Sequence, residues 1–322
     1  MKEIKVTKND SGQRIDRFLS KSFPLGQGQI CKLARKNCIK LNGKKCKPDT
    51  HIAENDIIKL FIPDEMLIPK AKSDPDDFTG VSNKIDIVYE DENILLVDKP
   101  VGMVVHEDES GDSDTLINRI KSYLYHKGEY RPENELSFAP ALCNRIDRNT
   151  CGIVIAAKNA ESLRILNQKI RDRELTKLYL CIACGKVTPD SATLTAYLEK
   201  NSDTNTVKIS DKKTKSNLTI KTKYKVIAYN GENSLLKVDL LTGRTHQIRA
   251  HLAYIGHALL GDGKYGNNKL NKKYGFKYQA LCSYELQFKF TTDAGCLSYL
   301  DGKCFKAKAP DFVKMFGGNI KL

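Results

Sequence analysis

The chain has 322 residues, longer than one average domain and shorter than three, so we expect one large and one small domain. Hydrophobic residues make up 40% and charged residues 29%, a composition that excludes a disordered chain. The formal net charge of +14 favours a polyanionic partner, either nucleic acid or an acidic membrane surface. The alternative is a lysine-rich surface that only contacts solvent.

Segments that would cross or enter a membrane are missing from the sequence pattern. No apolar run approaches the ~18 residues that span a bilayer, and the start, MKEIKVTKND, lacks the apolar core of a signal peptide. We therefore expect a cytoplasmic protein without a membrane partner, whose ten cysteines are reduced thiols. Cys181 and Cys184 form an isolated CxxC, which we interpret as part of a buried strand rather than as a metal or redox site.

Residues 1–62 are predicted to form the small domain. Apolar residues at helical spacing, one group beginning at Ile15 and one at Ile30, predict two short helices joined by the Pro-Gly segment 23–29. Short strands follow, with a tight turn at Asn42-Gly43. The domain is therefore expected to be two helices followed by a few strands.

The small domain is also the most basic part of the chain. It holds fourteen Lys and Arg against six Asp and Glu, an excess of eight in a fifth of the sequence. Such a compact basic surface suits a phosphate backbone, because each neutralised phosphate releases counterions. A solvated lysine face is the alternative. The residues that we expect to contact such a backbone are Arg14, Arg17, Arg35, Lys36 and Lys44.

This small domain resembles the S-four RNA-binding domain, a module named after a ribosomal protein of the small subunit. The matching segments are Gly12-Gln-Arg14-Ile-Asp16-Arg-Phe-Leu19 and Ile39-Lys-Leu41-Asn42-Gly43. The family usually has Gly before the second segment, where this chain has Lys36-Asn37-Cys38, and Asn can adopt the left-handed conformation that Gly would supply. The resemblance implies a small α/β domain that clamps structured RNA.

The rest of the chain divides into a linker and a large domain. Residues 63–83 hold three prolines and no apolar period, which indicates a partly extended linker. From residue 84 to about 316, strands alternate irregularly with helices, which predicts a mixed α+β fold rather than a doubly wound one. We expect a helix capped by Asn159 and another over 245–255, with Thr245 as its cap. No GxGxxG, P-loop or HExxH motif is present.

Asp147 is the first candidate for chemistry. It lies in the polar segment Asn144-Arg145-Ile-Asp147-Arg148-Asn149, directly before an apolar strand at 152–157, and loops held by rigid strands often carry catalytic side chains. The flanking arginines would keep an Asp ionised as a nucleophile or base. A surface ion pair or a loop cap is the alternative interpretation.

A second candidate segment is Gly243-Arg244-Thr-His246-Gln-Ile-Arg249-Ala-His251. His246 and Arg249 are three residues apart and would share a helical face, whereas His246 and His251 are badly spaced for a shared metal. Arg249 would pair with a buried carboxylate or, alternatively, with phosphate at the surface. Tyr179, at the start of a predicted strand, offers a ring for base stacking, although on its own it would be interpreted as a core residue.

Together these segments resemble the RluA-type family of RNA pseudouridine synthases. The motifs stand in the family's order from Val97-Asp-Lys99-Pro100-Val-Gly102, through those around Asp147, Tyr179 and 243–251, to Leu260-Gly-Asp262 and Tyr265-Gly266. The resemblance implies a catalytic domain with a mixed, largely antiparallel sheet over 84–316. The family usually has His-Arg-Leu-Asp-x-x-Thr-Ser-Gly, and here Asn144, Ile146 and Cys151 replace the His, Leu and Ser.

The resemblance implies a cofactor-free and metal-free isomerisation of uridine in RNA to pseudouridine. Asp147 would be the essential carboxylate, Arg249 its partner and Tyr179 the stacking residue, while Arg145, Arg244 and His246 would contact the RNA. Asn144 cannot titrate near neutral pH as the usual His can, but the Asp that the chemistry requires is retained. We expect a monomer acting on large-subunit ribosomal RNA, or alternatively on transfer RNA. A non-catalytic RNA-binding or ribosome-assembly protein, or a uracil glycosylase, would be the competing functions.

Overall fold

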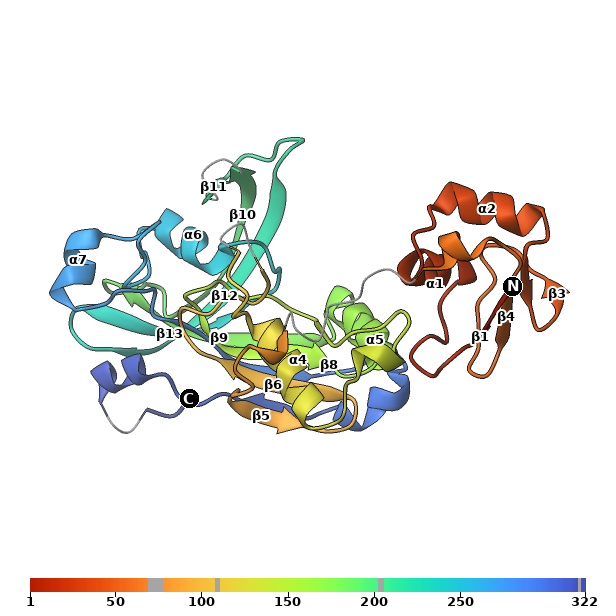
Figure 1. Ribbon diagram of the computed structural model, residues 1–322. Coiled ribbons are helices and arrows are strands. Elements are labelled where there is room, and N and C mark those ends of the chain that lie inside the picture. The colour runs from red at the N-terminus through yellow and green to blue at the C-terminus, as the bar shows by residue number, and fades with distance from the viewer. Residues whose placement is uncertain (69–77, 108–110, 202–205, 318–319) are drawn as a thin grey trace.

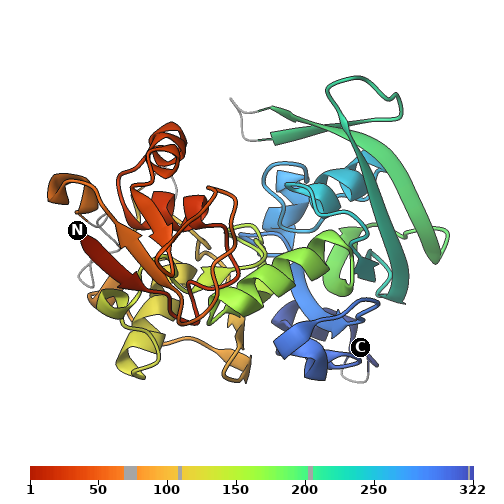
Figure 2. The same cartoon turned by 90° about the vertical axis from the view of Figure 1, so that its right-hand side faces the viewer.

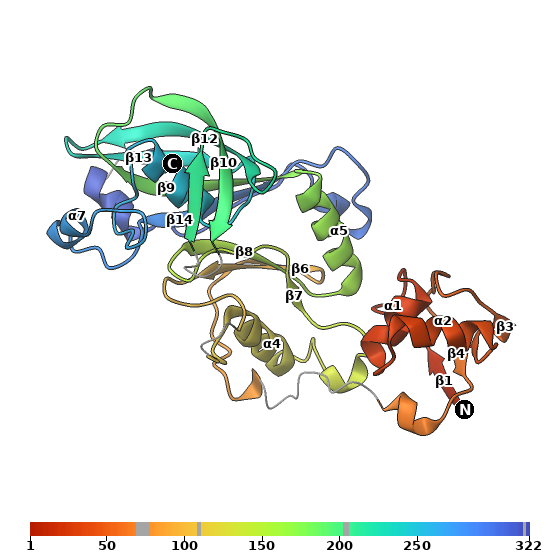
Figure 3. The same cartoon turned by 90° about the horizontal axis from the view of Figure 1, so that it is seen from above.

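The computed structural model describes residues 1–68, 78–107, 111–201, 206–317 and 320–322. They form a small N-terminal unit and a large unit built on one long sheet (Figure 1). The small unit lies beside helix α5 (Ala160–Arg171) of the large one, as Figures 2 and 3 show from two further sides. In this described part, no helix has the length and apolarity needed to cross a bilayer.

The small unit has two helices and a four-stranded antiparallel sheet in the order β1-β4-β2-β3. The two predicted helices and the tight turn at Asn42-Gly43 are confirmed, and Asn37 adopts the expected left-handed conformation, with φ 60°. The sequence analysis missed β1, because this short edge strand buries only Ile4. The elements are β1 Lys2–Lys5, α1 Ile15–Ser22, α2 Gln27–Arg35, β2 Ile39–Leu41, β3 Lys44–Lys45 and β4 Ile57–Leu60.

The segment interpreted as a linker, 63–83, is described only at its two ends, because 69–77 lie outside the described residues. At one end, the 3-10 helix η1 (Asp64–Leu67) inserts Leu67 into the core of the small unit. At the other end, Phe78 is fully buried in the core of the large unit. The segment is thus anchored in the small unit at its start and in the large unit at its end.

The large unit is a mixed sheet of eleven described strands in the order β11-β10-β12-β13-β9-β14-β8-β6-β5, with β7 on β8 and β15 on β14. All pairs are antiparallel except β8 with β14, so the predicted α+β class with a largely antiparallel sheet is confirmed. The strands are β5 Ile87–Glu90, β6 Ile94–Lys99, β7 Ala141–Leu142, β8 Cys151–Ala157, β9 Leu175–Cys184, β10 Ser191–Asn201, β11 Thr206–Ser210, β12 Leu218–Tyr229, β13 Asn233–Asp239, β14 Leu281–Phe288 and β15 Cys304–Lys306.

Helices cover both faces of this sheet. Because strand side chains alternate between faces, Leu95 and Val97 of β6 pack in one core with α4 and α6, while Ile94 and Leu96 pack in another with α5. Asn159 caps α5 as predicted, its side chain accepting a hydrogen bond from the Ser162 N–H at 2.8 Å. The remaining helices are α4 Leu116–His126, α5 Ala160–Arg171, α6 Gln247–Tyr254, α7 Asn268–Lys273, η2 Pro132–Asn134, η3 Gly295–Leu300 and η4 Asp311–Phe316.

The long strands β10 and β12, with β11, continue beyond the helical layers, and we call these three strands the arm (Figure 1). The inner side of the arm is apolar: Val207 and Ile209 of β11 pack with Ala250 of α6 and with the ring of Tyr265. The sequence analysis did not identify the arm, because its exposed positions are rich in Lys and Thr and its buried side is small.

Hydrogen bonds join the small unit to the start of α5 and to the segment before β7. Asn9 accepts from the Ala160 N–H at 3.2 Å and donates to Glu135 at 2.7 Å, while Ser137 donates to Asp10 at 2.7 Å. These polar contacts, together with Leu136, which packs against the core of the small unit, fix the orientation of the two units.

The parallel pair β8–β14 is the seam at which the two halves of the sheet meet. Its backbones approach so closely that a Cβ on Gly152 would lie 2.2 Å from the carbonyl oxygen of Ser283, and Gly152 itself has φ +107°. Only glycine fits both constraints. Because β8 follows directly on the loop that carries Asp147, the seam also fixes that loop.

Gly152→Ala should therefore lower the free energy of unfolding by about 2 kcal/mol or more, since it adds a backbone clash to conformational strain. Thermal or urea unfolding measures the loss. The matched control is Gly231→Ala, which has a similar positive φ of 92° but no atom within 4 Å of the added Cβ, and should lose only about 1 kcal/mol. Equal losses in the two variants would contradict a special role of the seam.

Candidate active site

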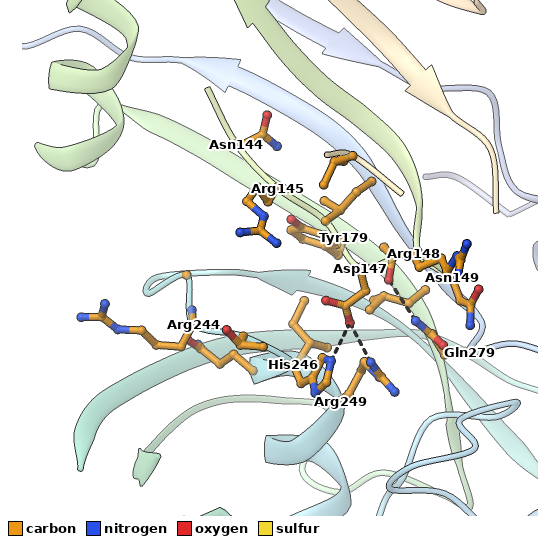
Figure 4. Close-up of a pocket in the computed structure, with 18 of the residues that line it drawn as sticks. Asn144, Arg145, Asp147, Arg148, Asn149, Tyr179, Arg244, His246, Arg249 and Gln279 are labelled. Carbon is orange, nitrogen blue, oxygen red and sulfur yellow. Dashed lines mark hydrogen bonds and ion pairs between the residues drawn. The ribbon is translucent and has the colours of Figure 1, made fainter. Parts of the chain in front are cut away.

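A cleft of about 930 Å³ opens at the seam, on the face of the sheet that α4 and α6 cover. Its lining combines the loop before β8, the start of β9, the turn before α6 and the loops around 261–264 and 277–281. The volume suits a nucleotide-sized ligand. Most of the charged side chains that line the cleft are cations, and Figure 4 shows Asp147 among them.

Asp147 lies on the floor of this cleft with its side chain one quarter exposed. Its Oδ2 accepts a hydrogen bond from Nη1 of Arg249 at 2.8 Å, although the two residues are 102 positions apart. The predicted flanking partner Arg148 instead turns to the Gly102 carbonyl at 3.1 Å and to Asp112 at 3.5 Å. The prediction that both flanking arginines accompany Asp147 is therefore wrong for Arg148, because its guanidinium binds these two other partners.

Lys99, at the end of β6, stabilises the backbone of the loop that carries Asp147. Its fully buried ammonium donates to three carbonyl oxygens, those of Pro100, Met103 and Arg148, at 2.8–2.9 Å. Burial lowers the pKa of Lys99 to about 8. Asn144 anchors the other side of the loop by accepting from the Ile155 N–H at 2.8 Å. The residue that replaces the family's usual His thus has a structural hydrogen bond in this chain.

Arg249 is shared between two carboxylates. Besides Asp147, it binds Asp262, with Nε to Oδ2 at 2.7 Å and Nη2 to Oδ1 at 3.0 Å. Burial on its own would lower the pKa of Arg249, but the two ion pairs raise it above its ordinary value. For Asp262 the signs are reversed: burial raises its pKa, and the contact with Arg249 brings the pKa below its ordinary value. A guanidinium is planar, so a partner that binds two of its nitrogens also fixes the direction in which the third nitrogen donates. Asp262 therefore aims Arg249 at Asp147.

His246 lies on the same side of Asp147, its Nε2 3.9 Å from Oδ2, and its ring is nearly buried. It is the N-cap of α6 and has a left-handed backbone, φ 52°, so the predicted start at Thr245 and the predicted helical face shared with Arg249 are both wrong. The reversal of the chain at His246 turns its ring back toward the loop. His251, by contrast, is buried and contacts the Thr222 hydroxyl at 3.0 Å.

Tyr179 of β9 borders the cleft with its ring otherwise buried in the core. Burial raises the pKa of its phenol to about 12, so the hydroxyl stays protonated at neutral pH. Arg145 and Arg244 are exposed at the rim of the cleft, and Figure 4 shows Arg244 directed away from Asp147. The predicted RNA-contacting residues of the small unit, Arg14, Arg17, Arg35, Lys36 and Lys44, do not line the cleft.

Among these basic residues, Arg14 forms a structural ion pair. It binds the buried Asp16, two residues further on, through two hydrogen bonds of 2.6 and 3.1 Å, both at the start of α1. Arg17, Arg35, Lys36 and Lys44 are exposed. The basic surface of the small unit is therefore carried mainly by these four side chains and their lysine neighbours.

The sequence analysis missed the roles of three residues that shape the site. Asp262 and Tyr265 were noted only as motif positions, and Lys99 only as part of an early motif. The signal that could have pointed to them is a buried carboxylate, a phenol and an ammonium within otherwise apolar or Gly-rich segments. No cluster of metal-ligating side chains is found among the residues that the structure describes.

Known proteins resemble this chain in both sequence and fold. The family model for RNA pseudouridylate synthase matches residues 93–254. A protein named an uncharacterised RNA pseudouridine synthase of Mycoplasma genitalium is 36% identical over 292 residues, 88% of each chain. Ribosomal large subunit pseudouridine synthase D of Borreliella burgdorferi is 32% identical over 268 residues, 81% of this chain and 78% of that protein.

Among solved structures, Human RNA Pseudouridylate Synthase Domain Containing 1 superimposes with a TM-score of 0.54 at 22% identity, covering 71% of this chain and 84% of that one, which supports the fold. Residues 1–62 lie outside the matched family segment, so the S-four resemblance stays a prediction. The matched segment spans half of the chain and contains Asp147, Tyr179 and Arg249. The chain therefore belongs to the RNA pseudouridylate synthase family, as its motifs predicted.

Proposed function

We propose that the protein isomerises uridines of large-subunit ribosomal RNA to pseudouridine with Asp147 as the reacting carboxylate. The observation that carries this proposal is one partly exposed carboxylate in a cleft rich in cations, paired through one oxygen with a buried guanidinium. Isomerisation within RNA is the activity of the family. The assignment of the carboxylate and of the substrate is our own.

The reaction needs a carboxylate beside the sugar of the target nucleotide. The bond from C1′ to the base nitrogen N1 breaks, the base turns, C5 bonds to C1′, C5 loses its proton and N1 gains one. A carboxylate near C1′ stabilises the positive charge that develops there, as in glycoside cleavage. Asp147 would attack C1′, attack the base ring or remove the C2′ proton, and all three start from the same position. No electrons or atoms are gained or lost, so the chemistry requires no redox cofactor.

The neighbouring side chains supply the binding steps. A uridine in a helix must leave its stack to reach Asp147, at a cost of a few kcal/mol that is smallest in loops and bulges. The Tyr179 ring, which borders the cleft, would stack on the extruded base. Arg145, exposed at the rim, would occupy the vacated place, and Arg244 would bind phosphate on the other side.

The substrate assignment depends on two observations. Relatives that cover most of this chain are named large-subunit ribosomal pseudouridine synthases. The small unit adds a strongly basic surface outside the cleft, which suits a large structured RNA. Transfer RNA is the other substrate class, and parallel assays with ribosomal and transfer RNA separate the two.

Asp147→Asn should reduce pseudouridine formation at least ~10³-fold, because the amide keeps the shape but loses the charge that the reaction uses. Tritium release from RNA labelled at uridine C5 measures the rate, and RNA binding should stay unchanged. The matched control is Asp112→Asn, an exposed acid near the rim that contacts Arg148 and should keep full activity.

Substantial turnover by Asp147→Asn would remove the carboxylate from the mechanism. Tight RNA binding by the wild-type protein without any tritium release would favour the non-catalytic alternative. Abasic sites in the product would favour a glycosylase.

Asp262→Asn should lower both activity, about 10²-fold, and the free energy of unfolding, by about 3 kcal/mol, since it breaks a buried ion pair and frees Arg249 to rotate. Tritium release and urea unfolding give the two values. The control is Asp114→Asn, which breaks an Arg–Asp pair that is partly exposed to solvent and should lose less than about 1 kcal/mol. Full activity in Asp262→Asn would show that Asp147 does not depend on an oriented Arg249.

A triple variant, Arg35→Gln with Lys36→Gln and Lys44→Gln, tests the basic surface of the small unit. Loss of three phosphate contacts should reduce the slope of log K against log salt by about 2 to 3 for ribosomal RNA fragments. The control removes the same charge from the C-terminal segment, at Lys308, Lys314 and Lys321, all of them exposed. If both triples change the slope equally, the small unit has no specific share in binding.

A further inference from the structure

Tyr265 connects the arm, His246 and Arg249 at one point. Its hydroxyl oxygen lies 2.9 Å from the backbone nitrogen of Val207 on β11 and 2.9 Å from Nδ1 of His246. Its ring lies 5.3 Å from the Arg249 guanidinium and meets the His246 ring edge to face at 5.7 Å. One aromatic side chain thus contacts both His246 and Arg249, the two neighbours of Asp147.

The hydrogen bonds of this phenol determine which nitrogen of His246 carries the proton. The Val207 N–H can only donate, so the phenol oxygen accepts from it. The phenol proton then needs an acceptor, and among the described residues Nδ1 of His246 is the one in reach. Burial raises the pKa of Tyr265, which keeps that proton on the phenol. An imidazole that accepts at Nδ1 and is neutral carries its proton on Nε2.

The neutral form of His246 is the one that its surroundings favour. Burial lowers the pKa of His246, an effect that Asp147 and Asp262 oppose and that Arg249 and Lys264 reinforce. The left-handed backbone of His246 is an uncommon conformation for a residue with a side chain, and the contacts with Tyr265 hold it.

The proton on Nε2 faces one oxygen of Asp147. Nε2 is 3.9 Å from Oδ2, the same oxygen that Arg249 binds at 2.8 Å. No hydrogen bond to Oδ1 occurs in the described part of the chain. Because the hydrogen bond from Arg249 and the nearby His246 ring both lie at Oδ2, Oδ1 is the oxygen that is open to a nucleotide.

We propose that Tyr265 is a positioning residue that fixes His246 as its Nε2–H tautomer, so that an N–H dipole lies beside the Oδ2 that Arg249 binds and Oδ1 of Asp147 is directed at the substrate. The same hydroxyl couples the position of the arm to His246, because it also binds the Val207 N–H on β11. This inference rests on the proposed role of Asp147 for its catalytic consequence, but the tautomer itself is a property of the free protein.

The tautomer can be read directly by two-bond ¹H–¹⁵N correlation spectra of the ¹⁵N-labelled full-length protein. The chain has six histidines, and comparison with His246→Gln assigns the signals of His246. The wild-type protein should show a neutral ring protonated at Nε2. A ring protonated at Nδ1, or at both nitrogens at neutral pH, would overturn the proposal whether or not any variant folds.

Tyr265→Phe keeps the ring and removes only the hydroxyl. We expect the Nε2–H pattern of His246 to be replaced by a mixture of tautomers, and kcat to fall about tenfold, the rate equivalent of one hydrogen bond, with little change in KM. The matched control is Tyr254→Phe on α6, whose hydroxyl also reaches the arm region, donating to Asp211 at 2.8 Å, but does not contact His246. It should keep both the tautomer and kcat.

A wild-type tautomer together with wild-type kcat in Tyr265→Phe would overturn the proposal, as would a change in KM alone. These results are separable from failure of the proposed function. If Asp147→Asn stays active while the Nε2–H tautomer is present, the carboxylate assignment is wrong and the assignment of the hydrogen bonds remains.

Discussion

The site depends on one buried guanidinium held between two carboxylates. Asp262 binds Arg249 along one edge, which leaves the remaining edge to Asp147. A single carboxylate in a cleft of cations would be drawn to whichever positive side chain is nearest. Because Arg249 is itself fixed, Asp147 has one defined partner and one defined orientation. This pairing also removes the large free-energy cost of burying an uncompensated arginine.

The fold supplies the precision that this pairing needs. Asp147 enters from a loop fixed by Lys99 and the seam, whereas Arg249 comes from α6 on the far half of the sheet. Gly152 allows the two halves to approach, so the distance between loop and helix is determined by backbone packing.

Local patterns in the sequence predicted much of this fold. The cap at Asn159, the turn at Asn42-Gly43 and the left-handed Asn37 were predictable because each depends on residues within a few positions. The arm was not, since its strands bury only a narrow apolar side against α6. The α6 cap was misjudged because Thr245 is a common cap, whereas the left-handed His246 is held by Tyr265 from 19 positions away.

In the site, too, the sequence predicted what depends on local motifs and missed what depends on distant partners. Motif order pointed to Asp147, Tyr179 and Arg249, but spacing alone favoured Arg148 as a neighbour of Asp147 and gave no role to Asp262. The ion pairs that orient Asp147 join Arg249 to Asp262, 13 positions away, and to Asp147, 102 positions away, so no local sequence pattern could indicate them. Long-range partners of this kind follow from the sheet topology, which the sequence alone does not provide.

The most direct test is a crystal structure of Asp147→Asn bound to an RNA stem-loop that contains the target uridine. The account predicts an extruded uridine on Tyr179, with its C1′ within about 3.5 Å of the side chain at position 147 and Arg249 still joining that side chain to Asp262. A uridine bound elsewhere, or a sugar far from position 147 while Arg249 contacts phosphate instead, would contradict it.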